Sequence, residues 1–297
     1  MEILVVGAGS LGSLVGGLLA REHAVTLLGR NPHVCAVRED GLRITGAIDA
    51  TVHPDAVTEV DAATSPDLAI LTVKSVDTAA ATRDLARVGP DATLSLQNGM
   101  GNEATITDRL SDPVLAGTTT YGALLGDPGT VACTGVGDVT LGPHGDAPVA
   151  SAERVGEAFR RAGIETEVVA DPRPHLWKKL AVNAGINPVT ALARVENGAL
   201  VDGPAAGIAT AAAVETAAVA RGHGVDLSGE RARAAVREVA EATARNRSSM
   251  LADVAAGRAT EIDAINGFVL DRAERAVPIN ETLTGLIRAW EVTEGLR

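Results

Sequence analysis

The chain begins with an apolar run, a glycine-rich turn and a helical run in direct succession. Residues 2–6 read Glu-Ile-Leu-Val-Val, residues 7–12 read Gly-Ala-Gly-Ser-Leu-Gly, and residues 13–21 have the composition of a helix. A short continuous apolar run is typical of a buried parallel strand. The three glycines then permit a tight turn, close approach of the backbone to a pyrophosphate, and close packing of helix on strand. This order predicts a dinucleotide-binding unit, with an ordinary glycine-rich turn as the alternative.

A second strand is expected at residues 24–28, and the residue that follows its glycine indicates which dinucleotide binds. A protein that binds NAD usually has Asp or Glu here, whereas this chain has Arg30. A carboxylate would repel a 2′-phosphate, and a guanidinium can bind it. The cofactor predicted from this position is NADP(H). The alternative is a surface arginine in a protein that is rich in arginine.

Further strands and helices alternate through the first half of the chain. Strands are expected at 42–45, 50–53, 67–73, 93–96, 114–120 and 165–169, a hairpin at 129–141, and helices at 76–86 and 151–162. Lys74 directly follows one of these strands and Asn98 lies two residues after another, at the sheet edge where open α/β folds bind ligands. A plain Asn-Gly turn remains the alternative for Asn98. The alternation predicts an α/β fold whose N-terminal part is a Rossmann-type doubly wound sheet.

Strand signals become scarce after Asp171-Pro-Arg-Pro174, a polar stretch with two prolines. The rest of the chain has helical patterns at about 175–187, 204–221, 229–245, 247–256, 260–275 and 280–294. We therefore expect a Rossmann domain at residues 1–170 and an all-helical C-terminal domain at residues 171–297.

One helix of the second half combines polar and apolar residues in an unusual way. Lys179, Asn183 and Asn187 recur every four residues and share one face, while most of their neighbours are apolar. A helix that is apolar almost all round is usually buried, and buried amines and amides need partners. A polar cleft with a small ligand meets this need, and a structural stripe bonded to neighbouring loops is the alternative. Because Pro188 disfavours a helical conformation for Asn187, the helix is expected to end there.

A second polar cluster lies near the C-terminus. Ser249 lies at a predicted helix junction, and Thr260 and Glu261 lie at the start of the following helix. Serine and threonine are common helix caps, and a glutamate in the first turn is favoured by the helix dipole. From spacing alone, capping is the simpler interpretation of Ser249 and Glu261.

Composition excludes several classes of function. The net charge of -12 argues against nucleic-acid binding, and no run reaches the ~18 apolar residues of a membrane span. The histidines and the two cysteines have no metal-ligand spacing, and the N-terminus lacks a signal peptide, so we expect a cytoplasmic protein without metal or membrane partners. The only lysines are Lys74, Lys178 and Lys179. A homodimer is kept as a hypothesis for the assembly.

Together these motifs resemble the ketopantoate reductase (2-dehydropantoate 2-reductase) family over nearly the whole chain. They include the glycine turn at 7–12, Gln-Asn-Gly-Met-Gly at 97–101, Lys-Leu-Ala-Val-Asn at 179–183, and Glu-Ile-Asp-Ala-Ile-Asn-Gly at 261–267. The resemblance implies reduction of the keto group of 2-dehydropantoate by NADPH, which gives pantoate for pantothenate and coenzyme A biosynthesis. It also implies an active site between a Rossmann domain and a helical domain.

The resemblance assigns a role to each matching residue. Lys179 would be the general acid, and Glu261 would lie beside it and the nicotinamide, where it tunes the lysine or holds the carboxamide. The substrate would be held by Asn98, Lys179, Asn183, Asn187, Asn197 and Ser249, and the cofactor by Gly7, Ala8, Gly9, Ser10, Leu11, Gly12, Arg30, Lys74, Asn98, Ala123 and Glu261.

Three other functions remain as alternatives. An enzyme of the same architecture could reduce a different branched 2-keto acid with NADPH. A non-catalytic NADP-binding sensor would keep the glycine turn and Arg30, but it has no need for Lys179 and two asparagines in register. A methyltransferase that uses S-adenosylmethionine would normally carry an acidic residue where Arg30 stands.

Overall fold

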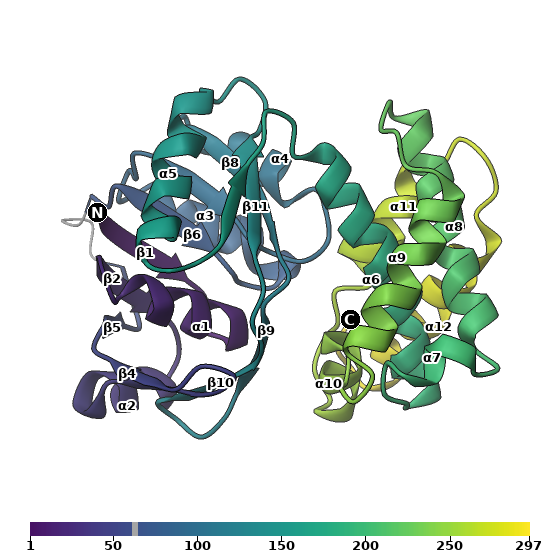
Figure 1. Ribbon diagram of the computed structural model, residues 1–297, viewed down its shortest axis with the longest axis horizontal. Coiled ribbons are helices and arrows are strands. Elements are labelled where there is room, and N and C mark those ends of the chain that lie inside the picture. Colours follow the sequence, from purple (N-terminus) through teal and green to yellow (C-terminus); the bar gives the residue numbers. More distant parts are fainter. Residues whose placement is uncertain (61–64) are drawn as a thin grey trace. The chain divides into compact units, whose positions relative to one another are not determined.

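The computed structural model describes residues 1–60 and 65–297, and it divides into two compact units (Figure 1). The first unit comprises residues 1–97 and 102–172, and the second comprises residues 98–101 and 173–297. The short segment 98–101 therefore belongs by its contacts to the second unit, although its neighbours in sequence belong to the first.

The first unit is built on a mostly parallel sheet. In the described part of the chain, its eight strands follow the order β12 (Thr166–Val168), β11 (Val139–Pro143), β8 (Val114–Thr119), β7 (Thr93–Ser95), β6 (Leu68–Leu71), β1 (Glu2–Val6), β2 (Ala24–Leu28) and β5 (Asp55–Val57). Among the described strands of this sheet, only the β11–β8 pair is antiparallel. The six strands from β5 to β8 have the order of a dinucleotide-binding sheet, with its switch point between β1 and β6.

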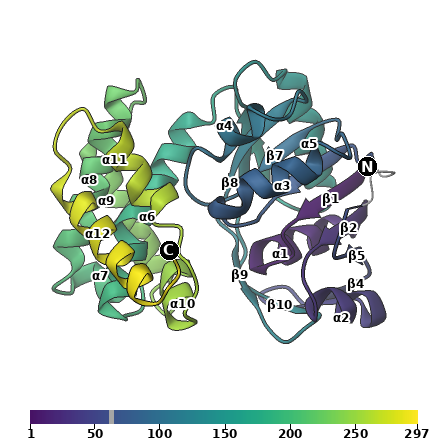
Figure 2. The same cartoon turned by 180° about the vertical axis from the view of Figure 1, so that it is seen from behind.

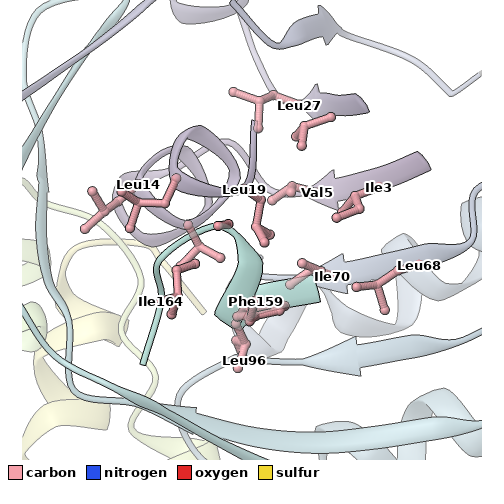
Figure 3. Close-up of a cluster of buried hydrophobic side chains, with 14 of the residues drawn as sticks. Ile3, Val5, Leu14, Leu19, Leu27, Leu68, Ile70, Leu96, Phe159 and Ile164 are labelled. Atoms are coloured by element: carbon pink, nitrogen blue, oxygen red, sulfur yellow. The ribbon is translucent and has the colours of Figure 1, made fainter. Parts of the chain in front are cut away.

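Helices cover both faces of this sheet (Figures 1 and 2). On one face, Ile3 and Val5 pack with residues of α1 (Ser10–Leu19) and α5 (Val149–Arg161), as Figure 3 shows. On the other face, Leu4 and Val6 pack with α3 (Thr78–Leu85) and α4 (Asn102–Thr107). Since successive residues of β1 point to opposite faces, its unbroken apolar run serves both cores. The predicted doubly wound fold is confirmed.

A smaller second sheet corrects one prediction. It contains β4 (Ala50–Val52), β3 (Leu42–Gly46), β10 (Thr130–Gly135) and β9 (Gly122–Leu125), and α2 (His33–Asp40) precedes β3. The predicted hairpin at 129–141 is wrong, because β10 pairs with β9, whereas β11 pairs with β8 in the main sheet. Alternation along 129–141 comes from two consecutive strands that belong to different sheets.

The second unit is helical. It contains α6 (Arg173–Ala193), α7 (Ala199–Asp202), α8 (Ala206–Gly222), α9 (Gly229–Ala242), α10 (Ser249–Ala255), a π-helix (Asp263–Gly267), α11 (Phe268–Arg272) and α12 (Pro278–Thr293). Alanine, valine and leucine fill most of its core. Trp177 is buried there, stacked on His223 at 6.1 Å and edge-on to Phe268 at 5.7 Å between ring centroids.

Helix α6 does not end at Asn187, as predicted, but continues through Pro188 to Ala193. Proline has no N–H, so the carbonyl of Ala184, four residues earlier, loses its partner within the helix. The side-chain Nδ2 of Asn266 donates a hydrogen bond to this carbonyl at 3.1 Å. A contact from a distant part of the sequence thus overrides the local signal, and the helix presents one longer face.

Candidate active site

A cavity of about 950 Å³ lies in the first unit at the carboxyl ends of β1, β2 and β6. This volume is in the usual range for small-molecule sites, and the position is the one where open α/β sheets bind dinucleotides. Gly7, Ala8, Gly9, Arg30 and Lys74 all line it. The complete lining comprises residues 6–9, 28–33, 58–60, 72–74, 77, 80, 81, 84, 87 and 125.

The three glycines of the turn differ in what surrounds them. Gly7 has a φ of +108°, which favours glycine. A Cβ on Gly12 would lie 2.1 Å from the Gly7 carbonyl oxygen and 2.5 Å from Thr72 Oγ1, so this position is needed for packing. A Cβ on Gly9 would meet no atom within 4 Å. The open space at Gly9 fits a ligand that approaches the backbone at the start of α1.

The remaining residues of this region are placed outside the cavity lining. Ser10 Oγ accepts a hydrogen bond from the N–H of Leu125 at 3.0 Å, and Leu11 packs against the core. Ala123 lies on β9 opposite Cys133, and Leu125, two residues further along the strand, lines the cavity in its place.

Two residues that the sequence analysis left without a role hold the strand ends together. Thr72 Oγ1 donates to the carbonyl oxygen of Gly7 at 2.9 Å, across the switch point. Gln97 is buried, and its Nε2 donates to the carbonyl oxygen of Val73 at 2.9 Å and to Thr78 Oγ1 at 2.7 Å. Gln97 thereby fixes the segment that leads into Lys74 and begins the segment that carries Asn98. The sequence signal that could have indicated a role for Gln97 is its position as a polar residue directly after the predicted buried strand 93–96.

The polar face of α6 is built as the spacing predicts. Lys179 and Asn183 are half-buried and Asn187 is buried, while Lys178 is exposed on another face. Among the described residues, none makes a hydrogen bond to the side-chain amides of Asn183 and Asn187. The polar atoms of both amides remain accessible, so they are available to hydrogen-bond a polar ligand at this face.

Lys179 is in an environment that weakens its hold on a proton. Burial lowers the pKa of Lys179 to about 8, and the attraction of the nearby Glu261 carboxylate opposes this shift. Asn98 Nδ2 donates to Glu261 Oε2 at 3.5 Å. A lysine, a carboxylate and an amide from three separate parts of the sequence are thus brought together in the second unit. An ammonium with a pKa near 8 is suited to general acid catalysis near neutral pH.

The backbone around Glu261 is irregular. The π-helix follows it, and such turns are frequent at functional sites. The 98–101 turn packs on this π-helix, because Met100 N–H donates to the Ala264 carbonyl oxygen at 3.0 Å. A Cβ on Gly99 would lie 2.6 Å from the Cβ of Ala264, so Asn98 is carried by a turn that only glycine allows to approach so closely.

The structure separates the two serines of the second cluster. Ser248 caps α10, since its Oγ accepts from the N–H of Leu251 at 3.1 Å, and Ser249 is exposed beside it. The capping interpretation of Ser249 is therefore wrong. Asn197 is buried, and its Nδ2 donates to Thr243 Oγ1 at 2.8 Å. Within residues 1–60 and 65–297, Asn197 Oδ1 has no hydrogen-bond partner.

A nucleotide-sized cavity at a glycine turn, together with a lysine of lowered pKa near a carboxylate, defines a dinucleotide-dependent oxidoreductase of the Rossmann class with a helical second unit. Comparison with known families identifies it further. Residues 3–146 match the family "Ketopantoate reductase PanE/ApbA" and residues 171–291 match its C-terminal part. The chain belongs to the ketopantoate reductase family, whose members are NADPH-dependent oxidoreductases.

Individual relatives agree with this family. The 2-dehydropantoate 2-reductase of Halobacterium salinarum is 44% identical over 97% of this chain and 98% of that protein. A PanE/ApbA family ketopantoate reductase from Ralstonia eutropha is similar in structure, with a TM-score of 0.90 and 32% identity over 99% of this chain and 100% of that one. A D-mandelate dehydrogenase with NADH and anilino(oxo)acetate has a TM-score of 0.93 and 26% identity, with both chains fully covered.

Across residues 1–60 and 65–297, no helix has both the length and the apolar character needed to cross a membrane.

Proposed function

We propose that this protein reduces 2-dehydropantoate to pantoate with NADPH, a step of pantothenate and coenzyme A biosynthesis. The observation that carries the proposal is the α6 face, where Lys179 lies near Glu261 and in register with the amides of Asn183 and Asn187. The name of the relative that is 44% identical over nearly the full length supports the same substrate.

The first unit supplies the cofactor site in this proposal. The pyrophosphate would lie at the start of α1 beside Gly9, because the first N–H groups of a helix have no partner within the helix and its dipole end is positive. The N–H groups of Gly7, Ala8 and Gly9 themselves bond to the carbonyl oxygens of Leu28 and Gly7. Arg30 is exposed at the end of β2 and lines the cavity, where it would bind the 2′-phosphate, with Lys74 as a second cation. Bound NADPH would supply the hydride.

The second unit supplies the proton and the substrate contacts. Hydride addition to the keto carbon places negative charge on the carbonyl oxygen, and Lys179 would stabilise that charge and donate its proton there. Asn183 and Asn187 would bind the hydroxyl and carboxylate of the substrate through their free amides. Asn98, Asn197 and Ser249 would complete the substrate contacts. Glu261 would keep Lys179 protonated, because its attraction raises the pKa of the amine.

A second candidate is reduction of a different 2-keto acid. The similarity to a D-mandelate dehydrogenase with NADH and anilino(oxo)acetate favours it, since that structure has a TM-score of 0.93. Arg30 distinguishes the two cofactors, because a guanidinium at this position favours NADPH over NADH. A non-catalytic sensor is not favoured, because it would have no use for a lysine whose pKa is lowered to about 8.

The test is NADPH oxidation by the purified protein with 2-dehydropantoate, 2-ketoisovalerate and phenylglyoxylate. We expect kcat/KM for 2-dehydropantoate to exceed that for 2-ketoisovalerate by about 100-fold or more, because buried amides left unpaired penalise a substrate that lacks the hydroxyl. A preference for phenylglyoxylate would favour the second candidate. NADPH binding without turnover of any acid would favour the sensor.

Two further properties belong to the proposal. A cytoplasmic location is supported by the use of NADPH, which is an intracellular reductant. A homodimer is a hypothesis that sedimentation of the purified protein would test.

A further inference from the structure

Pro188 interrupts the hydrogen-bond ladder of α6 within the polar face. Its missing N–H would have bonded to the carbonyl oxygen of Ala184, and its ring crowds that carbonyl. The interruption falls between the turn that carries Asn183 and the turn that carries Asn187. Proline is the usual cause of a helix kink. The two amides therefore need another contact to fix how they lie relative to each other.

Asn266 provides that contact. It is completely buried, and its Nδ2 donates to the Ala184 carbonyl oxygen at 3.1 Å and to Asn280 Oδ1 at 2.9 Å. Both partners are acceptors, because Asn280 Nδ2 itself donates to the carbonyl oxygen of Ala212 and to the Glu215 carboxylate. The orientation of the Asn266 amide is thereby determined, and only its nitrogen can face Ala184.

The other half of the Asn266 amide shows that this arrangement has a cost. In the described part of the chain, Asn266 Oδ1 is buried without a hydrogen-bond partner. A buried acceptor without a partner is unfavourable. The same side chain compensates for this by donating two hydrogen bonds from its Nδ2, to Asn280 Oδ1 and to the Ala184 carbonyl oxygen. The second of these acceptors is the carbonyl whose helical partner is missing because of Pro188.

Asn266 also belongs to the segment that carries Glu261. It lies in the π-helix Asp263–Gly267, whose Ile265 N–H donates to the carbonyl oxygen of Glu261 at 3.1 Å. One side chain thus ties the Glu261 segment to α6 between Asn183 and Asn187. The same hydrogen bond would set the separation between Glu261 and Lys179.

We infer that Asn266 is a positioning residue for the reaction, which acts by replacing the N–H that Pro188 removes from α6. The inference rests on the proposed function, because it assumes that the α6 face binds the keto acid. It predicts a kinetic effect through Asn183 and Asn187, although Asn266 itself contacts no substrate.

The test is a double-mutant cycle with Asn266→Ala and Pro188→Ala. Asn266→Ala alone should raise KM for the keto acid about 10-fold or more, because small displacements of binding groups are costly, while the Kd for NADPH stays unchanged. Pro188→Ala restores an N–H that bonds to the Ala184 carbonyl. In that background, Asn266→Ala should change KM by only about two-fold, and this loss of effect measures the coupling.

Thr284→Val is the matched control. Thr284 is buried on α12, and within residues 1–60 and 65–297 its hydroxyl bonds only to the Asn280 carbonyl oxygen of its own helix. This variant should lower Tm without changing KM, which separates a general loss of stability from a positioning effect.

Several outcomes would overturn the inference. It fails if Asn266→Ala keeps the wild-type KM, or if the substitution raises KM equally in both backgrounds. If Asn266→Ala does not fold, the inference requires that it fold and turn over in the Pro188→Ala background, and failure in both overturns it. The wild-type assay is independent of this series: an inactive wild-type enzyme would refute the proposed function, whereas an uncoupled cycle in an active enzyme refutes only the role of Asn266.

Discussion

Lys179 combines burial with a nearby carboxylate, and both act on its proton. The pKa of Lys179 is lowered to about 8, first by burial, while Glu261 raises it. The protonated form is the general acid, so kcat/KM should be constant below this pKa and fall as pH rises through about 8. Glu261→Gln removes the opposing attraction, so the inflection should move to lower pH. A pH profile of both enzymes checks this, and an inflection that moves upward would contradict it.

Lys178 provides a control for Lys179. The two lysines are adjacent, so they point about 100° apart on a helix, and Lys178 is exposed. Lys179→Ala should lower kcat by ~10²–10⁴ because a positioned proton donor is lost. Lys178→Ala should be close to wild type. The measurement is kcat for both variants beside an NADPH titration, which Lys179→Ala should leave unchanged. A dead Lys178→Ala enzyme would refute the assignment.

Arg30 is the residue that we expect to determine the preference for NADPH over NADH. Arg30→Ala should raise KM for NADPH by ~10–100-fold, the equivalent of a lost charged hydrogen bond of about 1.5–3 kcal/mol, and should leave NADH nearly unaffected. Arg21 is exposed and outside the cavity lining, so Arg21→Ala is the control. Steady-state kinetics with both nucleotides decide the matter. Equal losses for both would mean that Arg30 does not contact the 2′-phosphate.

At the scale of the element, two glycines of the 7–12 turn have different roles, one in ligand binding and one in packing. Gly9 has a φ of -84° and open space around it, whereas Gly12 is in close contact with Gly7 and Thr72. Gly9→Ala should keep the wild-type Tm but raise the Kd for NADPH at least about 10-fold, because the methyl group occupies ligand space. Gly12→Ala should lower Tm markedly. Thermal unfolding and fluorescence titration test the pair, and a destabilised Gly9→Ala enzyme would count against the cavity assignment.

Most elements could be predicted from the sequence because their apolar patterns are local. The strand at 2–6, the glycine turn and the register of Lys179 with Asn183 need only neighbouring residues. The two wrong predictions of secondary structure, the end of α6 at Asn187 and the hairpin at 129–141, concern segments whose structure depends on residues far away in the sequence. Asn266 carries α6 past Pro188, and the pairing of β10 and β11 with different sheets depends on β9 and β8. The sequence of α6 does not indicate Asn266 as its partner, and the sequence of 129–141 does not indicate β9 and β8.

The candidate site shows the same division. Spacing could place Lys179, Asn183 and Asn187 on one face, but the proximity of Glu261 to Lys179 depends on how the helical unit packs. Ser248 and Ser249 are equally good caps by composition, and the path of the backbone decides between them. The role of Gln97 is not indicated by its neighbours in sequence, because its hydrogen bond to Val73 joins two segments that lie far apart along the chain.

At the scale of the whole molecule, the acidic surface predicts a dependence on salt. The net charge is -12 at pH 7, and repulsion among like charges destabilises the compact state. Raising KCl from about 0.1 M to about 1 M shortens the Debye length to ~3 Å and should raise Tm by several degrees at pH 7.5. The same increase should have much less effect near pH 5, since the sequence pI is about 5.0. Thermal scans at both pH values test this, and an equal shift at both would implicate a cause other than charge.

The two tryptophans, Trp177 and Trp290, both lie in the helical unit, and the first unit contains the single tyrosine, Tyr121. Emission excited in the indole band therefore reports on the helical unit alone, and one of the two emitting rings, Trp177, is stacked on His223 two residues before Lys179. Quenching of this emission on addition of NADPH, whose reduced nicotinamide absorbs where indole emits, would report cofactor binding without any introduced label. The unfolding of the helical unit can thus be followed by the protein's own tryptophans, while the first unit contributes no indole emission.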